Sequence, residues 1–235
     1  FLLFMAIAWI FRVDKKHRGL FATAAATSNT LFIGIPVNTA LFGDVAMTQV
    51  LLYFFGNTVF FWTIGNYCLA SEGEHKSQRL AVRDILKRIF SPPLCGMLAG
   101  IAWVLIGLPL PLVLKNSCIM LGSIASPLAL VFSGVILRRI DWKGVKMGRD
   151  ITPCLICRLA LSPAILIGML HFIPLPPLTG HVFIMQSSLP CMTNIALVAA
   201  FYGADRQFSS VFVALSTILA MITVPCWMTV ITLYM

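Results

Sequence analysis

Two apolar segments of this chain are interrupted halfway by a proline and by several small polar residues. The first is Ser28–Pro36, which reads Ser-Asn-Thr-Leu-Phe-Ile-Gly-Ile-Pro, and the second is Ser187–Asn194, which reads Ser-Ser-Leu-Pro-Cys-Met-Thr-Asn. Proline removes a backbone donor and clashes with the preceding helical turn, so both segments are predicted to break in the middle of a bilayer. Paired breaks of this kind are typical of the binding sites of secondary transporters.

The composition places the chain in a membrane. Of its 235 residues, 59% are hydrophobic and 11% are charged, which is more apolar surface than a water-soluble domain of this size can bury. The chain starts inside an apolar stretch without an initiator methionine, and we interpret it as a fragment that begins within a helix. The eight apolar stretches, all but the first long enough to span, fall roughly at residues 1–11, 20–42, 46–70, 89–107, 112–137, 151–172, 178–204 and 207–235.

The distribution of basic residues predicts the orientation. Most of the 17 lysines and arginines lie in three loops, at residues 12–18, 76–88 and 138–149. These loops fall on one side if every apolar stretch crosses the bilayer, which predicts that they are cytoplasmic and that the carboxyl terminus is outside. The net charge of +9 is therefore read as a topology signal, and no nucleic-acid partner is expected.

An internal repeat is indicated by two similar signatures. Phe42-Gly43-Asp44 follows the first broken segment, and Tyr202-Gly203-Ala204-Asp205 follows the second. The later spans contain Gly56-Asn57-Thr58 and Leu215-Ser216-Thr217, respectively. Because the two broken segments cross in opposite directions, the repeats are predicted to be inverted, with about eight of ten parental helices present.

The polar stretch 71–91 separates the repeats. Apolar residues recur at helical spacing within Gln78–Phe90, which fits either an interfacial amphipathic helix or a solvated linker helix. We expect residues 1–70 to be the remnant of the first repeat, in a crossing-helix transport domain. Residues 71–91 are then the cytoplasmic linker, 92–137 a scaffold part of the second repeat, and 138–235 the transport-domain part of that repeat.

The broken segments supply a site chemistry. Pro36 and Pro190 are predicted to begin the second half of each broken helix, where unpaired N–H groups and the helix dipole favour a carboxylate. Arg158, the basic residue well inside a span, is predicted to attract anions, to clamp a broken backbone or to snorkel to headgroups. The candidate substrate-binding residues are Asn29, Thr30, Pro36, Ser187, Ser188, Pro190, Asn194 and Arg158.

Other chemistries find less support in the sequence. No Asp or Glu lies inside a span, which disfavours a carboxylate sodium site, although the carbonyls of the first half-helices leave cation coordination open. Cys154 and Cys157 form a CxxC that is better read as membrane packing than as a metal site. No cofactor and no metal are expected, and an enzyme is disfavoured because no pair of titratable groups sits together within the bilayer.

These residues resemble the auxin efflux carrier family, which also contains bacterial malate-type permeases. The likeness covers essentially the whole chain, and the short central loop favours a permease of the bacterial type. The pieces that carry it run in the family's order: Ser28–Pro36, Ser91-Pro92-Pro93-Leu94, Ser126–Leu130, Leu189-Pro190 with Asn194, Tyr202–Asp205, and Leu215-Ser216-Thr217 with Pro225.

The resemblance implies a polytopic all-α membrane bundle of ten helices in inverted repeats, like those of NhaA and the bile-acid symporters. It also implies a substrate site at two crossed broken helices, elevator-like movement and a homodimer. We therefore expect a multi-pass plasma-membrane (inner-membrane) permease or efflux carrier of small organic anions such as carboxylates. A sodium-coupled symporter and a non-transporting ligand sensor are the alternatives; the substrate and the energy coupling are not specified by the sequence.

Overall fold

The structure is a computed structural model that describes residues 1–73, 90, 92–138 and 149–234. In these ranges every regular element is helical, and the one β-type contact is an isolated bridge, so the all-α prediction is confirmed. The predicted amphipathic helix Gln78–Phe90 lies outside the described residues except for Phe90.

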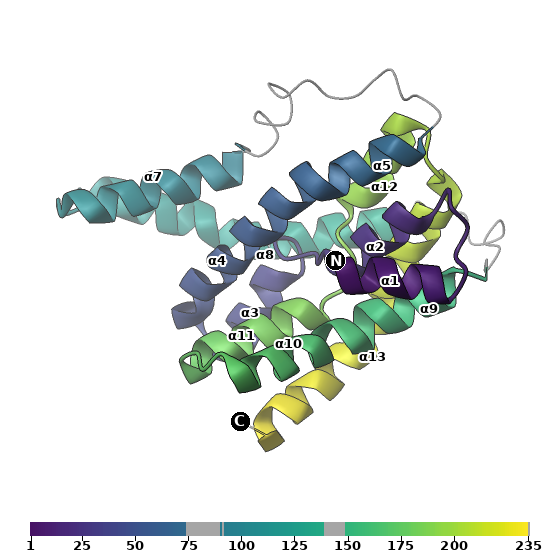
Figure 1. Cartoon of the computed structure of the whole chain (residues 1–235). Helices are drawn as coiled ribbons and strands as arrows, with labels where there is room; N and C mark the ends of the chain where they lie inside the picture. Colours follow the sequence, from purple (N-terminus) through teal and green to yellow (C-terminus); the bar gives the residue numbers. More distant parts are fainter. Residues whose placement is uncertain (74–89, 91, 139–148, 235) are drawn as a thin grey trace.

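Helices occupy all eight predicted apolar stretches. The first stretch forms α1, the two interrupted stretches form a pair of half-helices each, and the others form single rods or rods with a local irregularity (Figure 1). The helices outside the long spans are α1 (Leu2–Ile10), α2 (Arg18–Ala26), α3 (Gly34–Phe42), α7 (Pro92–Ile106), α8 (Leu112–Arg138), α11 (Pro177–Ser188) and α12 (Asn194–Tyr202).

Both interrupted stretches are broken helices, as predicted. The backbone turns extended at Thr27 after α2 (ψ 135°) and at Leu189 after α11 (ψ 158°). Pro36 lies in the first turn of α3. The prediction that Pro190 begins the second half-helix is wrong: α12 begins at Asn194. Pro190 instead lies in the extended segment. Because a residue before proline avoids the helical region, Leu189 is extended and α11 ends at Ser188.

Both second half-helices end at a glycine with positive φ. α3 is followed by Gly43 with φ 75°, and α12 is followed by Gly203 with φ 69°. Glycine adopts positive φ without the steric cost that a Cβ brings, so it is the usual residue after a helix terminus. The aromatic-glycine signatures in the sequence therefore mark equivalent helix ends.

Three long helical stretches in the described part of the chain are apolar enough to cross a membrane by themselves. They are Asp44–Glu72, Ile151–Phe172 and Arg206–Leu233, and with the broken helices they make this a multi-pass membrane protein. Their elements are a short 3-10 turn (Asp44–Ala46), α4 (Met47–Phe60), a π-helical turn (Phe61–Gly65), α5 (Asn66–Glu72), α9 (Ile151–Ile156), a π-helical turn (Cys157–Leu161), α10 (Ser162–Phe172) and α13 (Arg206–Tyr234).

The first half-helix, α2, lies in the middle of the core. Most of its side chains are small, and Leu20, Phe21 and Ala24 are fully buried. Small residues let membrane helices approach closely: a Cβ on Gly65 of the π turn would lie 2.8 Å from Thr23 Cγ2 of α2. The main core cluster joins α2 to α5, α9, α12 and α13. The breaks are thus held inside packed protein rather than in lipid.

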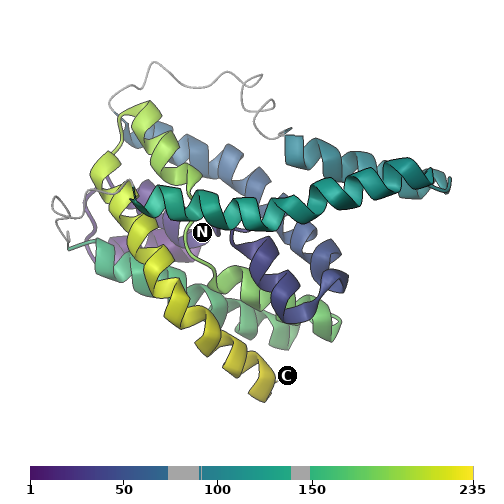
Figure 2. The same ribbon diagram turned by 180° about the vertical axis from the view of Figure 1, so that it is seen from behind.

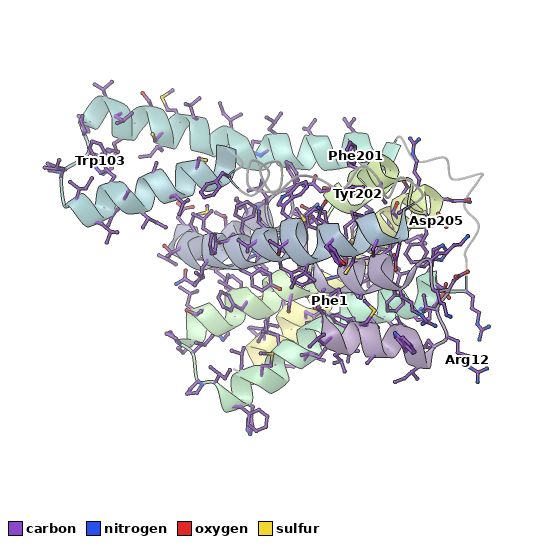
Figure 3. All side chains as sticks on the ribbon, turned by 45° about the horizontal axis from the view of Figure 1, so that its top comes forward. Phe1, Arg12, Trp103, Phe201, Tyr202 and Asp205 are labelled. Carbon is purple, nitrogen blue, oxygen red and sulfur yellow. The ribbon has the colours of Figure 1, made fainter. Side chains whose placement is uncertain are left out.

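Polar loop ends gather at one end of this body. His17, just before α2, lies 3.0 Å from Asp205 (Nε2 to Oδ2) and 3.6 Å from Asp150 (Nδ1 to Oδ2). The Glu72 carboxylate accepts from the Gly19 and Leu20 amides at the start of α2. Figure 3 shows Arg12 and Asp205 at this end and Trp103 at the far tip of α7. These residues therefore mark opposite ends of the molecule.

α7 and α8 form a hairpin that projects from the body (Figures 1 and 2). α8 contacts α3. Apolar side chains of the hairpin are strongly exposed, including Val104 at 77%, Leu105 at 81% and Val113 at 79%. Such a surface is stable in lipid or against another protein, but not in water.

Candidate binding site at the crossing of the broken helices

The extended segments of the two broken helices meet as a short antiparallel pair. Ser28 forms a bridge with Cys191, the Asn29 amide donates to the Pro190 carbonyl at 2.9 Å, and the Met192 amide donates to the Thr27 carbonyl at 3.4 Å. We call these two segments, residues 27–29 and 190–192, the crossing. It satisfies in protein several backbone groups that lipid would leave unpaired.

A long helix from each half of the chain fastens one side of the crossing. On α4, the Asn57 amide group accepts from Ser28 N and donates to Ser28 O, both at 3.0 Å. On α13, the Ser216 hydroxyl accepts from Cys191 N at 3.2 Å. Both residues belong to the polar triplets that the sequence placed in corresponding spans, and they act on the two bridged residues.

Arg158 lies behind the crossing and is fully buried. Its guanidinium donates to the Ala25 carbonyl (3.0 Å), the Leu189 carbonyl (3.0 Å), the Ser28 hydroxyl (2.8 Å) and the Ser187 carbonyl. It thereby joins the carboxyl-terminal ends of α2 and α11. Of the predicted roles, this geometry matches clamping of the broken backbone.

The π-helical turn at Cys157–Leu161 carries Arg158. A π turn adds a residue to the helix and changes which side chains face a neighbour, and it is common at functional sites. The Leu159 carbonyl within it accepts from Trp227 Nε1 at 2.7 Å. The irregularity is therefore stabilised by α13 and keeps Arg158 directed at the crossing.

On its open side the crossing borders a cavity of about 170 Å³. We call it the crossing cavity. The described residues that line it carry no charge and combine polar groups with aromatic rings: Ser28, Asn29, Thr30, Leu31, Phe32, Phe54, Thr58, Trp62, Met192, Thr193 and Asn194.

Two lining side chains are buried with an unused hydrogen-bonding atom. Asn29 is 3% exposed and accepts from Phe32 N through Oδ1, while its Nδ2 has no partner among the described residues. Thr58 is 2% exposed, and its hydroxyl is also without a partner there. An unpaired buried polar atom costs about 1–3 kcal/mol, so the position of these two beside one cavity makes them candidate ligand-binding groups.

The helix ends contribute unequally to the crossing cavity. Thr193 and Asn194, at the start of α12, line it directly, so the positive end of that helix dipole faces the cavity. The start of α3 is covered instead: a Cβ on Gly34 would lie 2.9 Å from Leu189 Cδ1 and in contact with the Gln186 amide. The first broken helix reaches the cavity through the Thr30–Phe32 turn.

The predicted site residues divide into four groups. Asn29, Thr30 and Asn194 line the crossing cavity, while Pro190 belongs to the crossing and Arg158 lies behind it. Ser187 and Ser188 are buried at the end of α11, where their hydroxyls donate to the Ile184 and Met185 carbonyls. Ser187 also lines a separate cavity beside α1 and α10. Pro36 lies within α3, away from the lining residues.

The sequence reasoning missed the contribution of α4 and the π-helical turn after it to the lining. Phe54 and Thr58 of α4 and Trp62 of the turn recur at helical spacing and line the crossing cavity. The sequence signal for this surface is the polar triplet at residues 56–58, which also aligns the predicted repeats. Cys154 of the CxxC is buried, and its thiol donates to the Phe21 carbonyl at 3.6 Å, which is consistent with a packing role.

Comparison with known proteins agrees with this architecture. Residues 1–228 match the family model described as "Membrane transport protein". An uncharacterized transporter of Methanothermobacter thermautotrophicus is 28% identical over 227 residues, which cover 95% of this chain and 72% of that protein. The uncharacterized transporter MJ1031 of Methanocaldococcus jannaschii is 23% identical over 222 residues, 93% of this chain and 70% of that protein. The resemblance inferred from the sequence is thereby confirmed, and the chain belongs to the membrane transport protein family of auxin efflux carriers.

Proposed function

We propose that this membrane transporter carries small organic anions such as carboxylates, and that the crossing cavity is the substrate site. The observation that carries the proposal is the unused Asn29 Nδ2 and Thr58 hydroxyl, both buried beside the cavity. Nδ2 is a donor, and a hydroxyl donates when its partner is an acceptor. A carboxylate offers acceptors to both.

The electrostatics of the cavity fit an anion without a fixed counter-charge in the lining. The amino end of α12 supplies a partial positive charge. The Arg158 guanidinium lies one side chain behind the cavity wall, since it binds the Ser28 hydroxyl. With about 170 Å³, the cavity is smaller than drug-binding pockets, which usually measure roughly 300–1,000 Å³, and it suits a compact acid.

Several features support an inverted repeat with alternating access. Each broken helix crosses the other, ends at a positive-φ glycine and is fastened by a polar side chain of a following long helix. In our proposal, residues 1–70 and 138–235 move as the transport domain, 71–91 is the linker, and 92–137 belongs to the scaffold.

We further propose that the α7–α8 hairpin contributes to a homodimer and that the protein resides in the plasma membrane. The exposed apolar side chains of the hairpin can pack against lipid and against a second copy of the chain. His17 lies in one of the predicted basic loops, and its partner Asp150 directly follows another. This end is therefore proposed to be cytoplasmic, with the carboxyl terminus outside.

An uptake assay with the protein in liposomes tests the substrate site. Asn194→Ala should reduce uptake of a labelled dicarboxylate roughly 10-fold or more, because a hydrogen bond to a charged group contributes about 1.5–3 kcal/mol. Asn116→Ala, on exposed α8, is the matched control and should leave uptake unchanged. Normal uptake by an equally abundant Asn194→Ala protein would contradict the assignment.

A further inference from the structure

Arg158 has the bonding pattern of a coordinated cation. Its guanidinium is fully buried and bonds to three backbone carbonyls and one hydroxyl, from Ala25, Ser187, Leu189 and Ser28. No carboxylate in the described part of the chain pairs with it. Its charge is therefore balanced by oxygen dipoles, as the charge of a monovalent ion is balanced in a ring of carbonyls.

The carbonyls come from a place that attracts positive charge. Ala25 is in the last turn of α2, Ser187 is in the last turn of α11, and Leu189 follows it. A helix carries a partial negative charge at its carboxyl end, and here two such ends converge within apolar surroundings. Broken helices with free ends of this kind attract or coordinate a cation unless the protein supplies one.

We propose that Arg158 is a tethered cation that takes the place of a soluble one at the crossing, so that this carrier binds its anion without sodium. The proposal deepens the proposed function and rests on it for the substrate, while the structural role of Arg158 stands without a substrate. It disfavours the sodium-coupled symporter that the sequence left open. Arg158 is then a positioning residue, because it reaches the crossing cavity only through Ser28.

The positive charge of Arg158 lies directly behind the wall of the crossing cavity. The hydroxyl of Ser28 accepts from Arg158, and Ser28 is both a lining residue and a member of the bridge with Cys191. A fixed cation at this point raises the potential of the cavity wall in every state of the transporter. A soluble ion would do so only after binding, and its concentration would then set the affinity for the anion.

The first experiment needs no substrate. Melting temperatures of the purified protein in detergent are measured in sodium, potassium or choline chloride. The wild-type protein should melt at the same temperature in all three. Arg158→Ala and Arg158→Met leave the carbonyls unbalanced and should lower the melting temperature by roughly 5–15 °C, and low-millimolar ethylguanidinium should restore part of the loss to Arg158→Ala.

Arg158→Lys separates charge from packing and covers the case in which the neutral variants fail to fold. Lysine keeps the positive charge but loses the planar fork of donors. This variant should fold, should melt between the wild-type protein and Arg158→Met, and should bind a dicarboxylate equally well with and without sodium. Arg206→Ala, at the exposed start of α13, is the control and should behave as the wild-type protein.

The outcomes distinguish this proposal from the proposed function. A wild-type protein whose melting temperature or anion affinity rises with sodium would overturn the tethered cation. A melting temperature of Arg158→Met equal to that of the wild-type protein would overturn it as well. If ethylguanidinium does not restore the melting temperature of Arg158→Ala, the loss of stability is due to packing and not to charge, which also overturns the proposal. If no carboxylate binds the wild-type protein at all, the proposed function fails while the substrate-free melts still test Arg158.

Discussion

Both broken segments contain backbone groups that have no helical hydrogen-bond partner, and different side chains bond to these groups in the two segments. In the first, an asparagine amide satisfies both backbone groups of Ser28 from α4. In the second, the Ser216 hydroxyl satisfies one group, the Cys191 amide, and donates its own hydrogen to the Val213 carbonyl of α13. The first break is thus bonded on two sides and the second on one.

The difference extends to the crossing cavity. Ser28, Asn29 and Thr30 of the first break are almost completely buried, whereas Met192, Thr193 and Asn194 of the second are half-buried. The first segment therefore forms the more rigid wall of the crossing cavity, and its side chains are held in fixed orientations beside it. The second brings the open end of α12 to the cavity. The two broken segments therefore differ in geometry: the first is almost completely buried, and the second brings the start of α12 to the cavity.

Removal of the stronger fastening should have the largest effect on stability. Asn57→Ala leaves the Ser28 amide buried without a partner and removes one of the two donors to the Ser28 carbonyl, which still accepts from the Thr30 amide. The unpaired group and the lost hydrogen bond together cost roughly 2–4 kcal/mol, and we expect a clear drop in the melting temperature of the purified protein. Asn57→Leu keeps the volume of the side chain without either polar atom and should lose a similar amount, so a wild-type melting temperature in this variant would argue against the two-sided bond.

Removal of the weaker fastening should cost less. Ser216→Ala leaves the Cys191 amide as the one unpaired group, at about 1–2 kcal/mol. The same melting assay measures it, with Ser117→Ala on exposed α8 as the matched control. A loss as large as that of Asn57→Ala would show that the two breaks are fastened equally.

The double variant Asn57→Ala, Ser216→Ala measures how far the two fastenings depend on each other. Both act on the bridged pair Ser28 and Cys191, so they share a partner structure. Non-additivity of about 0.5–1 kcal/mol is expected. Strictly additive losses would mean that each break holds its shape without the other.

The smallest effect on stability should come from Thr58. Its hydroxyl is buried without a partner in the described structure, so Thr58→Val removes an unsatisfied group at nearly constant volume. The melting temperature should stay unchanged or rise by a few degrees, while the affinity for the transported anion should fall several-fold. A destabilised Thr58→Val protein would show that the hydroxyl has a structural bond instead.

Much of this architecture follows from local sequence rules. The proline and polar runs predicted both breaks, and the apolar stretches predicted the helices, because in a bilayer each backbone group must be bonded locally. Asn29 and Asn194 were predicted to share one site because each lies at a break. The crossing brings their segments together.

Other features depend on tertiary packing and could not be predicted in this way. Pro190 prevents helix at Leu189, but the position at which α12 resumes depends on the crossing partners of residues 190–192. The partners of Arg158 lie up to 133 residues away, so the sequence left its role open. Thr58 looks like any threonine in a membrane helix, which usually bonds to its own backbone, and only its place beside the cavity distinguishes it.

If the crossing cavity binds an organic anion through neutral donors, Asn29→Asp should abolish that binding. Aspartate keeps the oxygen that accepts from Phe32 N and replaces the unused Nδ2 donor by a negatively charged acceptor. Binding of a panel of small carboxylates to the purified protein should be lost, or weakened by roughly 100-fold or more, while the protein remains folded. Carboxylate binding by folded Asn29→Asp with the affinity of the wild-type protein would contradict the account.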